Sequence, residues 1–326
     1  MSDERDGLDV MREFHQRRQR VIGATDAPKI LLLSRWGTPL SVYRDKTTTE
    51  EPKPPSLPAW LGLKLQSTVG ELYTTATGTR LRAVNVQFHH PEHPFIGCHL
   101  DFRAWGNAKL LIEAKTRAST RGWGPDGSSE VPVEEWVQGQ HEMAVTGATE
   151  THFAVLFGHR DFRVLRVMRD EAFIAGMIPK LVAFWNDHVL PRIPPMADAL
   201  DHETVHELYP EPVKEIRPAT PEQSAMVRDL VGARKAAAAA KAAEDALVNR
   251  IKQAIGDAAG ISGTFGEITW TKNKDGNKTD WELVAATFKA DNPEAWAEAY
   301  AEHTVTKPGA RTIRYALNEE DDDARE

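Results

Sequence analysis

The sequence predicts an α/β fold for the first part of the chain, in which helices alternate with strands. Residues 60–77 and 134–146 have the apolar spacing of helices. Between them, residues 102–105 and 109–113 flank Gly106-Asn107, a pair typical of a tight hairpin. Residues 151–157 then have the composition of a buried strand. This order of helix, hairpin, helix and strand predicts a sheet that is covered by helices.

Further elements extend this order at both ends. We expect a helix over residues 10–20 and a second one over 25–33, capped near Thr25. After the strand at 151–157, a short turn should lead to a paired strand and then to a helix. The expected ranges are 162–168 for that strand, 171–190 for that helix, and 47–58 and 117–132 for two loops.

Three charged residues lie where the hairpin would bring them together. Asp101 precedes its first strand, and Glu113 and Lys115 lie near the end of its second. Carboxylates on neighbouring strands can hold Mg²⁺, which prefers oxygen ligands, and a lysine can orient a water against a phosphodiester. Glu71, on the preceding helix, could direct a third carboxylate at the same ion. The pattern favours a metal-dependent site that acts on a phosphodiester.

Five stretches carry a resemblance to a known family: Ile22 to Asp26, Gly70-Glu71, the strand at Asp101, Ile112 to Thr116, and Gln138 to Gly147. Over roughly residues 15–190 the chain resembles the PD-(D/E)XK nucleases. Within them it is most similar to the YqaJ-like viral recombinases, the group that includes the lambda-type phage exonucleases. The resemblance implies a PD-(D/E)XK core, which is a central mixed sheet flanked by helices.

Position by position, the resemblance implies a role for each of these side chains. The metal ligands would be three acids and one main-chain carbonyl, from Glu71, Asp101, Glu113 and Ala114. Lys115 would orient or help to deprotonate the attacking water, and Gln138 would be the accessory glutamine. The cofactor would be Mg²⁺, with Mn²⁺ as a substitute.

An arginine and a threonine near the N-terminus match the pair that binds a terminal 5′-phosphate in lambda-type exonucleases. In that group an arginine lies seven residues before a small hydroxyl residue, as Arg18 lies before Thr25. Arginine suits this role because its planar fork can make two charge-assisted hydrogen bonds to one phosphate. Thr25 replaces the more usual serine and keeps the hydroxyl donor. Arg17 and Arg20 are close enough to be alternatives to Arg18.

Each assignment also has a purely structural alternative. Glu113 and Lys115 fit a solvated, alternating strand face, and Glu71 fits an exposed position of a helix. The arginines near the N-terminus fit a general basic face, and Gln140 competes with Gln138 by helical register. The histidines between residues 89 and 99 lack the ligand spacing that is typical of zinc sites.

The composition is that of a globular protein. Of 326 residues 41% are hydrophobic, and neither a membrane-spanning run nor a signal peptide is recognisable, so we expect a cytoplasmic protein. Cys98 is the single cysteine, which excludes an internal disulfide and a cysteine-ligated iron–sulfur cluster. The net charge of −8 is unusual for a protein that binds DNA, but basic residues cluster at 17–35 and 115–121.

The remainder of the chain has a different character. We expect a nuclease-like domain over residues 1–195, a linker over 196–220, a helix and hairpin region over 221–318 and an acidic tail over 319–326. The helix should span 221–255, with an apolar stripe at its C-terminal end. Alternating apolar residues on either side of Asp275-Gly276 predict an amphipathic hairpin.

The residues and the resemblance together predict a metal-dependent 5′ to 3′ exodeoxyribonuclease that resects double-stranded DNA ends in phage or prophage recombination. The expected partners are double-stranded DNA ends, a single-strand annealing protein and further copies of the chain. The resemblance implies that these copies form a trimer. We expect no association with a membrane. The alternatives are a structure-specific endonuclease of the same superfamily and a non-cleaving recombination scaffold. The intact acidic set disfavours the scaffold.

Overall fold

The computed structural model of the chain describes residues 18–48, 56–84, 86–212, 214–274, 276 and 278–306. The helix expected over 10–20 therefore lies outside the described residues except at its end, and the acidic tail at 319–326 lies outside them entirely. The chain divides into two compact units, residues 1–210 and 211–326. Each unit is described by itself.

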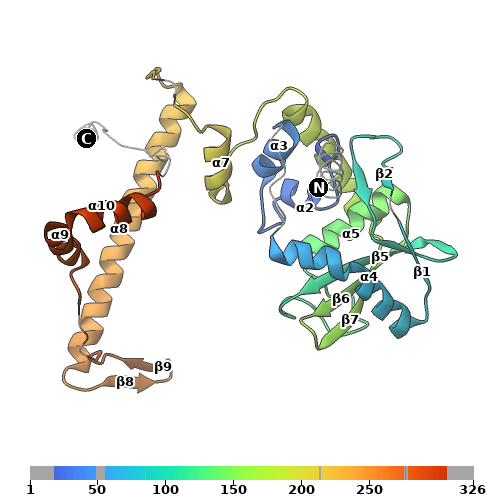
Figure 1. Ribbon diagram of the computed structural model, residues 1–326. Helices are drawn as coiled ribbons and strands as arrows, with labels where there is room; N and C mark the ends of the chain where they lie inside the picture. The colour runs from blue at the N-terminus through green and yellow to red at the C-terminus, as the bar shows by residue number, and fades with distance from the viewer. Residues whose placement is uncertain are drawn as a thin grey trace, which may run out of the picture. The chain divides into compact units, whose positions relative to one another are not determined.

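The first unit is built around a five-stranded mixed sheet (Figure 1). The strand order is β1-β4-β5-β6-β7, in which β5 and β6 are parallel and the other neighbouring pairs are antiparallel. These strands span Leu81–Ala83, Phe102–Ala104, Asn107–Arg117, Glu150–Phe157 and Asp161–Met168. A separate small sheet pairs β2 (Gln87–His89) with β3 (Gly97–His99).

The predicted hairpin forms between β4 and β5. Ala104 pairs with Asn107, so Trp105 and Gly106 make the turn, one residue earlier than predicted. Gly106 has a φ of +77°, a left-handed conformation that glycine adopts without steric strain. The hairpin sets the register that brings the end of β4 beside the middle of β5.

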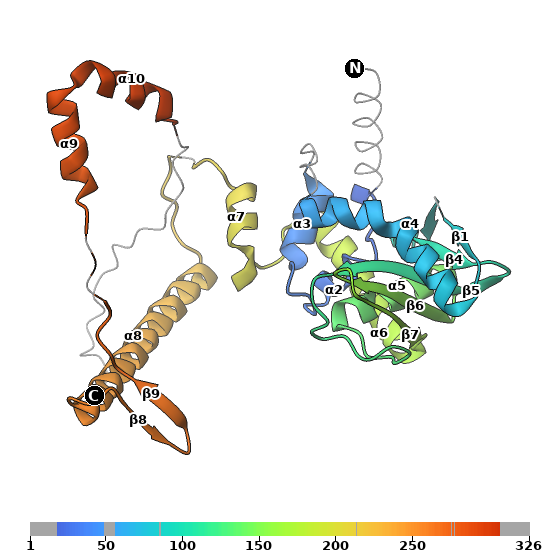
Figure 2. The same ribbon diagram turned by 60° about the horizontal axis from the view of Figure 1, so that its bottom comes forward.

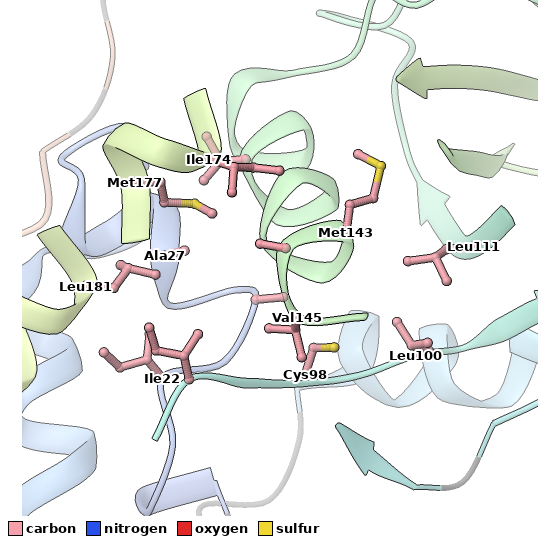
Figure 3. Packing of buried hydrophobic residues seen from close by; sticks show 14 of the residues in the cluster. Ile22, Ala27, Cys98, Leu100, Leu111, Met143, Val145, Ile174, Met177 and Leu181 are labelled. Carbon is pink, nitrogen blue, oxygen red and sulfur yellow. The ribbon is translucent and has the colours of Figure 1, made fainter. Parts of the chain in front are cut away.

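Helices cover both faces of the sheet, which confirms the predicted α/β class (Figure 2). On one face α4 (Leu57–Thr77) packs Val69 and Tyr73 against Leu110 and Ile112 of β5. On the other face, Leu111 belongs to a larger cluster with side chains of α5 (Val133–Thr146) and α6 (Glu171–Phe184), as Figure 3 shows. Successive side chains point to opposite faces of a strand, so β5 contributes to both layers.

The helices near the N-terminus differ in part from the expected ones. The helix predicted over 25–33 is only α2 (Ala27–Ile30), because the chain leaves it at Leu32, whose φ is +57°. An unpredicted helix, α3 (Pro39–Thr47), follows Thr38, whose hydroxyl accepts a hydrogen bond from the backbone N–H of Ser41 as its N-terminal cap. The helix predicted over 171–190 is confirmed as α6 and a π-helical turn (Trp185–Val189).

The first unit extends to residue 210, beyond the boundary predicted at 195. A 3-10 turn (Ala199–Asp201) and α7 (His202–Leu208) form where the sequence predicted a linker. They are anchored to the start and the middle of α3 by a hydrogen bond from Thr38 to Asp201 and an ion pair between Arg44 and Glu207. These contacts join polar side chains that are far apart in sequence, so local patterns do not reveal them.

The second unit begins with α8 (Pro221–Ile255), which confirms the predicted long helix. The predicted hairpin across Asp275-Gly276 is wrong: β8 (Gly260–Gly263) pairs instead with β9 (Gly266–Thr269). Trp281 begins another helix, α9 (Trp281–Asp291), because the Asp280 carboxylate caps it, and α10 (Pro293–His303) follows. Among the described residues, none of the helices has both the length and the apolar character to cross a membrane.

Candidate active site

Asp101 and Glu113 come together where β4 begins and β5 passes beside it. Phe102 pairs with Ile112, so the antiparallel register places the preceding Asp101 next to the following Glu113. The backbone N–H of Ala114 donates to Asp101 Oδ2 at 2.9 Å. In a strand the N–H and C=O of one residue point to the same side, so the Ala114 carbonyl faces the same edge as Asp101.

Lys115 and Gln138 complete the predicted cluster. Gln138 of α5 donates from Nε2 to Glu113 Oε2 at 2.9 Å, and its Oε1 accepts from Lys115 Nζ at 2.9 Å. The Lys115 ammonium also lies 3.4 Å from Glu113 Oε2. Gln140, the alternative by register, points elsewhere, because its amide binds the carbonyl of Met168 and the N–H of Asp170. The structure thus brings Asp101, Glu113, Lys115 and Gln138 together.

Two further acids of α5 belong to this cluster and were not predicted as site residues. Glu135 lies 3.3 Å from Lys115 Nζ and forms an ion pair with Arg117. Glu142 is fully buried, and its Oε1 accepts from Gln138 Nε2 at 2.8 Å. Residues three and four apart share one face of a helix, so 135, 138 and 142 follow one another along α5. That spacing around Gln138 was the signal that could have found them.

Glu71 is not part of the contacts that join α4 to this cluster. The inward face of α4 follows Val69, Gly70 and Tyr73, all buried, whereas Glu71 is exposed. One turn before Val69 on that same face, Gln66 donates from Nε2 to Asp101 Oδ1 at 2.6 Å. The side chain that α4 directs at the acids is therefore a neutral amide. The periodicity of the buried positions was the signal for Gln66.

The cluster contains more acidic than basic side chains. Burial raises the pKa of Glu113 to about 8, and the neighbouring Asp101 adds to the rise, against the opposing charge of Lys115. Burial likewise raises the pKa of Asp101 and raises that of Glu142 well above its usual value. Burial alone would lower the pKa of Lys115, but the surrounding carboxylates outweigh it and raise the pKa. Lys115 is therefore a cation at neutral pH.

The donor set suits a hard divalent cation. Crowded, buried carboxylates are stabilised by an added positive charge, and Mg²⁺ and Mn²⁺ take oxygen ligands together with water. Within the described ranges, His, Cys, Asp and Glu side chains do not form any group of three that could hold a metal by themselves. The remaining oxygen donors would have to be neutral, as the Ala114 carbonyl and the Gln66 amide oxygen are. The residues present fit such an ion.

Arg18 and Thr25 lie together beside this cluster. The guanidinium Nη2 of Arg18 is 3.4 Å from Thr25 Oγ1. Both residues line a cavity of about 140 Å³ that Gln138 and Glu142 also line. Arg20 is exposed, and Arg17 lies outside the described residues. The spacing of seven residues therefore corresponds to a real contact at the edge of the acidic cluster.

A buried ion pair holds the backbone around Thr25 in place. Asp26 Oδ2 accepts from Lys46 Nζ at 2.6 Å and from the N–H of Gly23 at 2.9 Å, and Arg18 lies 4.0 Å from its other oxygen. Burial would raise the pKa of Asp26, but the charges of Lys46 and Arg18 outweigh burial and lower it to about 2. Asp26 is thus ionised at neutral pH and fixes the loop that carries Thr25.

Comparisons with known proteins agree with the resemblance predicted from the sequence. Residues 13–149 match the model of the YqaJ-like viral recombinase domain, which confirms the resemblance over this part of the chain. A Bacillus subtilis protein named YqaJ, itself uncharacterized, is 32% identical over 197 residues. That match covers 59% of this chain and 60% of the relative, so the chain spans less than two thirds of the relative's length.

Solved structures with some similarity include two nucleases. An alkaline exonuclease from Laribacter hongkongensis is 18% identical, with a TM-score of 0.45 over 60% of this chain and 95% of that one. A phage-related exonuclease from Haemophilus somnus 129PT is 11% identical, with a TM-score of 0.40 over 51% of this chain and 92% of that one.

Proposed function

From the match of residues 13–149 to the YqaJ-like viral recombinase domain, we propose that the chain is a metal-dependent exodeoxyribonuclease acting 5′ to 3′ on double-stranded DNA. The observation that carries the proposal is the adjacency of two sites. Asp101, Glu113 and Lys115 form a cluster suited to phosphodiester hydrolysis, and Gln138 of that cluster lines the same cavity as Arg18 and Thr25.

The residues of the cluster have complementary roles in this proposal. Mg²⁺, or Mn²⁺ in its place, would be held by Asp101, Glu113, the Ala114 carbonyl and Gln66. We assign to Gln66 the metal-binding role that was predicted for Glu71, because Gln66 is the α4 side chain that contacts Asp101. Such an ion, when bound, supplies an activated water and positive charge for the phosphate oxygens.

Lys115 acts as a fixed ammonium group beside the reacting phosphate. Two of its contacts, to Gln138 Oε1 and Glu113 Oε2, hold Nζ in place on β5. The ammonium can then donate a hydrogen bond to the attacking water and offset the negative charge that develops in the transition state. As a cation, Lys115 orients the water and does not take the proton itself.

The direction of digestion follows from the Arg18 and Thr25 pair. A guanidinium and a hydroxyl 3.4 Å apart offer several donors to a terminal phosphate. A 5′-phosphate held there would place a bond near the end of its strand at the cluster, so cleavage would proceed inward from the 5′ end. The product would be a 3′ single strand, on which an annealing protein could load during phage or prophage recombination. We extend the proposal to a cytoplasmic homo-oligomer, with a trimer as the expected form.

Linear and circular DNA test this proposal together. One linear duplex is labelled at either 5′ end in separate samples and digested beside a covalently closed circle, with Mg²⁺ or with EDTA. The proposal predicts early release of label from both 5′ ends, an intact circle and no reaction in EDTA. Cleavage of the circle would favour an endonuclease, and no cleavage of any substrate would favour a scaffold.

A further inference from the structure

Glu142 lies at the junction between the catalytic cluster and the cavity at Arg18 and Thr25. Its side chain is fully buried in α5 and lines that cavity. Oε1 accepts a hydrogen bond from Gln138, whereas Oε2 has no hydrogen-bond partner within the part of the chain that the structure describes. A buried carboxylate with an unpaired oxygen costs stability, so Glu142 is a poor candidate for a purely structural residue.

The contacts of Gln138 indicate what Glu142 does. A glutamine amide has two N–H donors on Nε2 and one carbonyl acceptor. Nε2 of Gln138 lies 2.9 Å from Glu113 Oε2 and 2.8 Å from Glu142 Oε1, while Oε1 accepts from Lys115 at 2.9 Å. Both donors thus face carboxylates and the acceptor faces the ammonium. This pattern selects one of the two possible orientations of the amide.

We propose that Glu142 is a positioning residue that acts through Gln138. It anchors the second N–H of the amide, and the amide in turn sets the separation of Glu113 and Lys115. Its location on the cavity wall puts this anchor next to the bound DNA end as well. The inference rests on the proposed nuclease function, because the geometry it maintains is that of the catalytic cluster.

Three variants separate positioning from a structural role. Glu142→Leu removes both oxygens with little change in volume, and Glu142→Gln keeps an oxygen that can accept from Gln138. Gln140→Leu is the matched control, because Gln140 is equally buried in α5 but binds Met168 and Asp170 away from the cluster. Each is compared with the wild type by thermal unfolding and by single-turnover cleavage of linear duplex at saturating Mg²⁺.

The expected results differ in sign between the two measurements. Glu142→Leu should cleave about 10- to 100-fold more slowly, as is usual when a group that orients a catalytic ligand is lost. Its Tm should be unchanged or higher, since a buried carboxylate with an unpaired oxygen is removed. Glu142→Gln should recover most of the rate. Gln140→Leu should lower the Tm and leave the rate of the folded protein unchanged.

Two results of the cleavage and unfolding measurements would overturn the inference. One is wild-type cleavage by Glu142→Leu; the other is a joint loss of Tm and rate that Glu142→Gln does not recover. Proton exchange of the Gln138 side-chain amide, followed by NMR in the full chain, gives a readout independent of cleavage. It should be slow in the wild type and faster in Glu142→Leu. If the wild type cleaves no DNA, the proposed nuclease function is wrong. If amide exchange of Gln138 is the same in Glu142→Leu as in the wild type, the positioning role of Glu142 is wrong.

Discussion

The substitution Gln66→Glu should make the folded chain more dependent on Mg²⁺. Gln66 Nε2 lies 2.6 Å from Asp101 Oδ1, so a carboxylate at this position adds a negative charge beside Asp101 and Glu113. Two like charges about 4 Å apart repel by roughly 4 kcal/mol at an effective dielectric constant of about 20. Protonation of one acid relieves part of this repulsion, so we expect a loss of about 1–3 kcal/mol in unfolding free energy without metal.

Added Mg²⁺ should reverse that loss, because a third carboxylate is a stronger ligand than a neutral amide. A ligand that binds only the folded state stabilises it by RT ln(1 + [L]/Kd), so a tenfold lower Kd adds about 1.4 kcal/mol at saturation. The assay is thermal unfolding in EDTA and over a series of Mg²⁺ concentrations. Gln66→Glu should have a lower Tm than the wild type in EDTA, and its Tm should rise more than that of the wild type when Mg²⁺ is added.

The exposed Glu71 provides the matched comparison. Glu71→Gln changes a carboxylate to an amide on the same helix, and it should leave the Mg²⁺ dependence of unfolding as in the wild type. The reasoning would be refuted if Gln66→Glu showed the Mg²⁺ dependence of the wild type. A marked loss of Mg²⁺ binding in Glu71→Gln would restore the assignment predicted from the sequence.

Three further predictions concern single side chains. Lys115→Ala should keep DNA and Mg²⁺ binding but lose most single-turnover cleavage, because in the proposed mechanism the ammonium orients water and offsets developing charge. Equal losses in binding and cleavage would instead indicate a structural lysine. Arg18→Ala should reduce the preference for 5′-phosphorylated over 5′-hydroxyl duplex by about 10- to 100-fold, because a charge-assisted contact contributes roughly 1.5–3 kcal/mol. Equal losses of cleavage rate on both substrates would argue against the phosphate site. Burial lowers the pKa of His141 to about 4, against about 6.5 in the unfolded chain. The unfolded state alone binds this proton between those two pH values, so His141 contributes a loss of roughly 3 kcal/mol in unfolding free energy as the pH falls from about 6.5 to 4. Because the buried acids with raised pKa contribute in the opposite direction, the test is the difference in unfolding free energy between the wild type and His141→Gln in denaturant titrations, which should change by about that amount over this range, and a difference independent of pH would contradict it.

The parts of the site that the sequence revealed are those fixed by local geometry. Asp101, Glu113 and Lys115 belong to one hairpin, whose register follows from its turn, so their proximity could be predicted from neighbouring residues. Arg18 and Thr25 are similarly close in sequence and meet across a short loop. In each case few residues separate the partners, and few arrangements of the chain could keep them apart.

The parts that escaped prediction depend on tertiary packing. Glu71 drew attention because it is charged, but the face of α4 that meets the sheet is set by Val69 and Tyr73 and brings Gln66 inward instead. Glu142 looks like an ordinary helical glutamate until α5 is buried against the sheet.

The false hairpin at 275 has a more local cause. Trp281 and Leu283, which alternate with polar residues, also fit the first turn of a helix, whereas Ile268 lies in β9. The cap by Asp280 was the signal that distinguished the two structures.

The central claim is that Asp101 and Glu113 form a catalytic metal site, and isosteric variants test it most directly. Asp101→Asn and Glu113→Gln each replace a carboxyl group by a neutral amide and keep the shape of the side chain. The measurement is Mg²⁺-dependent release of nucleotides from linear duplex DNA, with a thermal unfolding curve for each variant. We predict that both variants remain folded, with a Tm no lower than that of the wild type in EDTA, and lose cleavage at every Mg²⁺ concentration. Cleavage by either variant at the rate of the wild type would contradict the account.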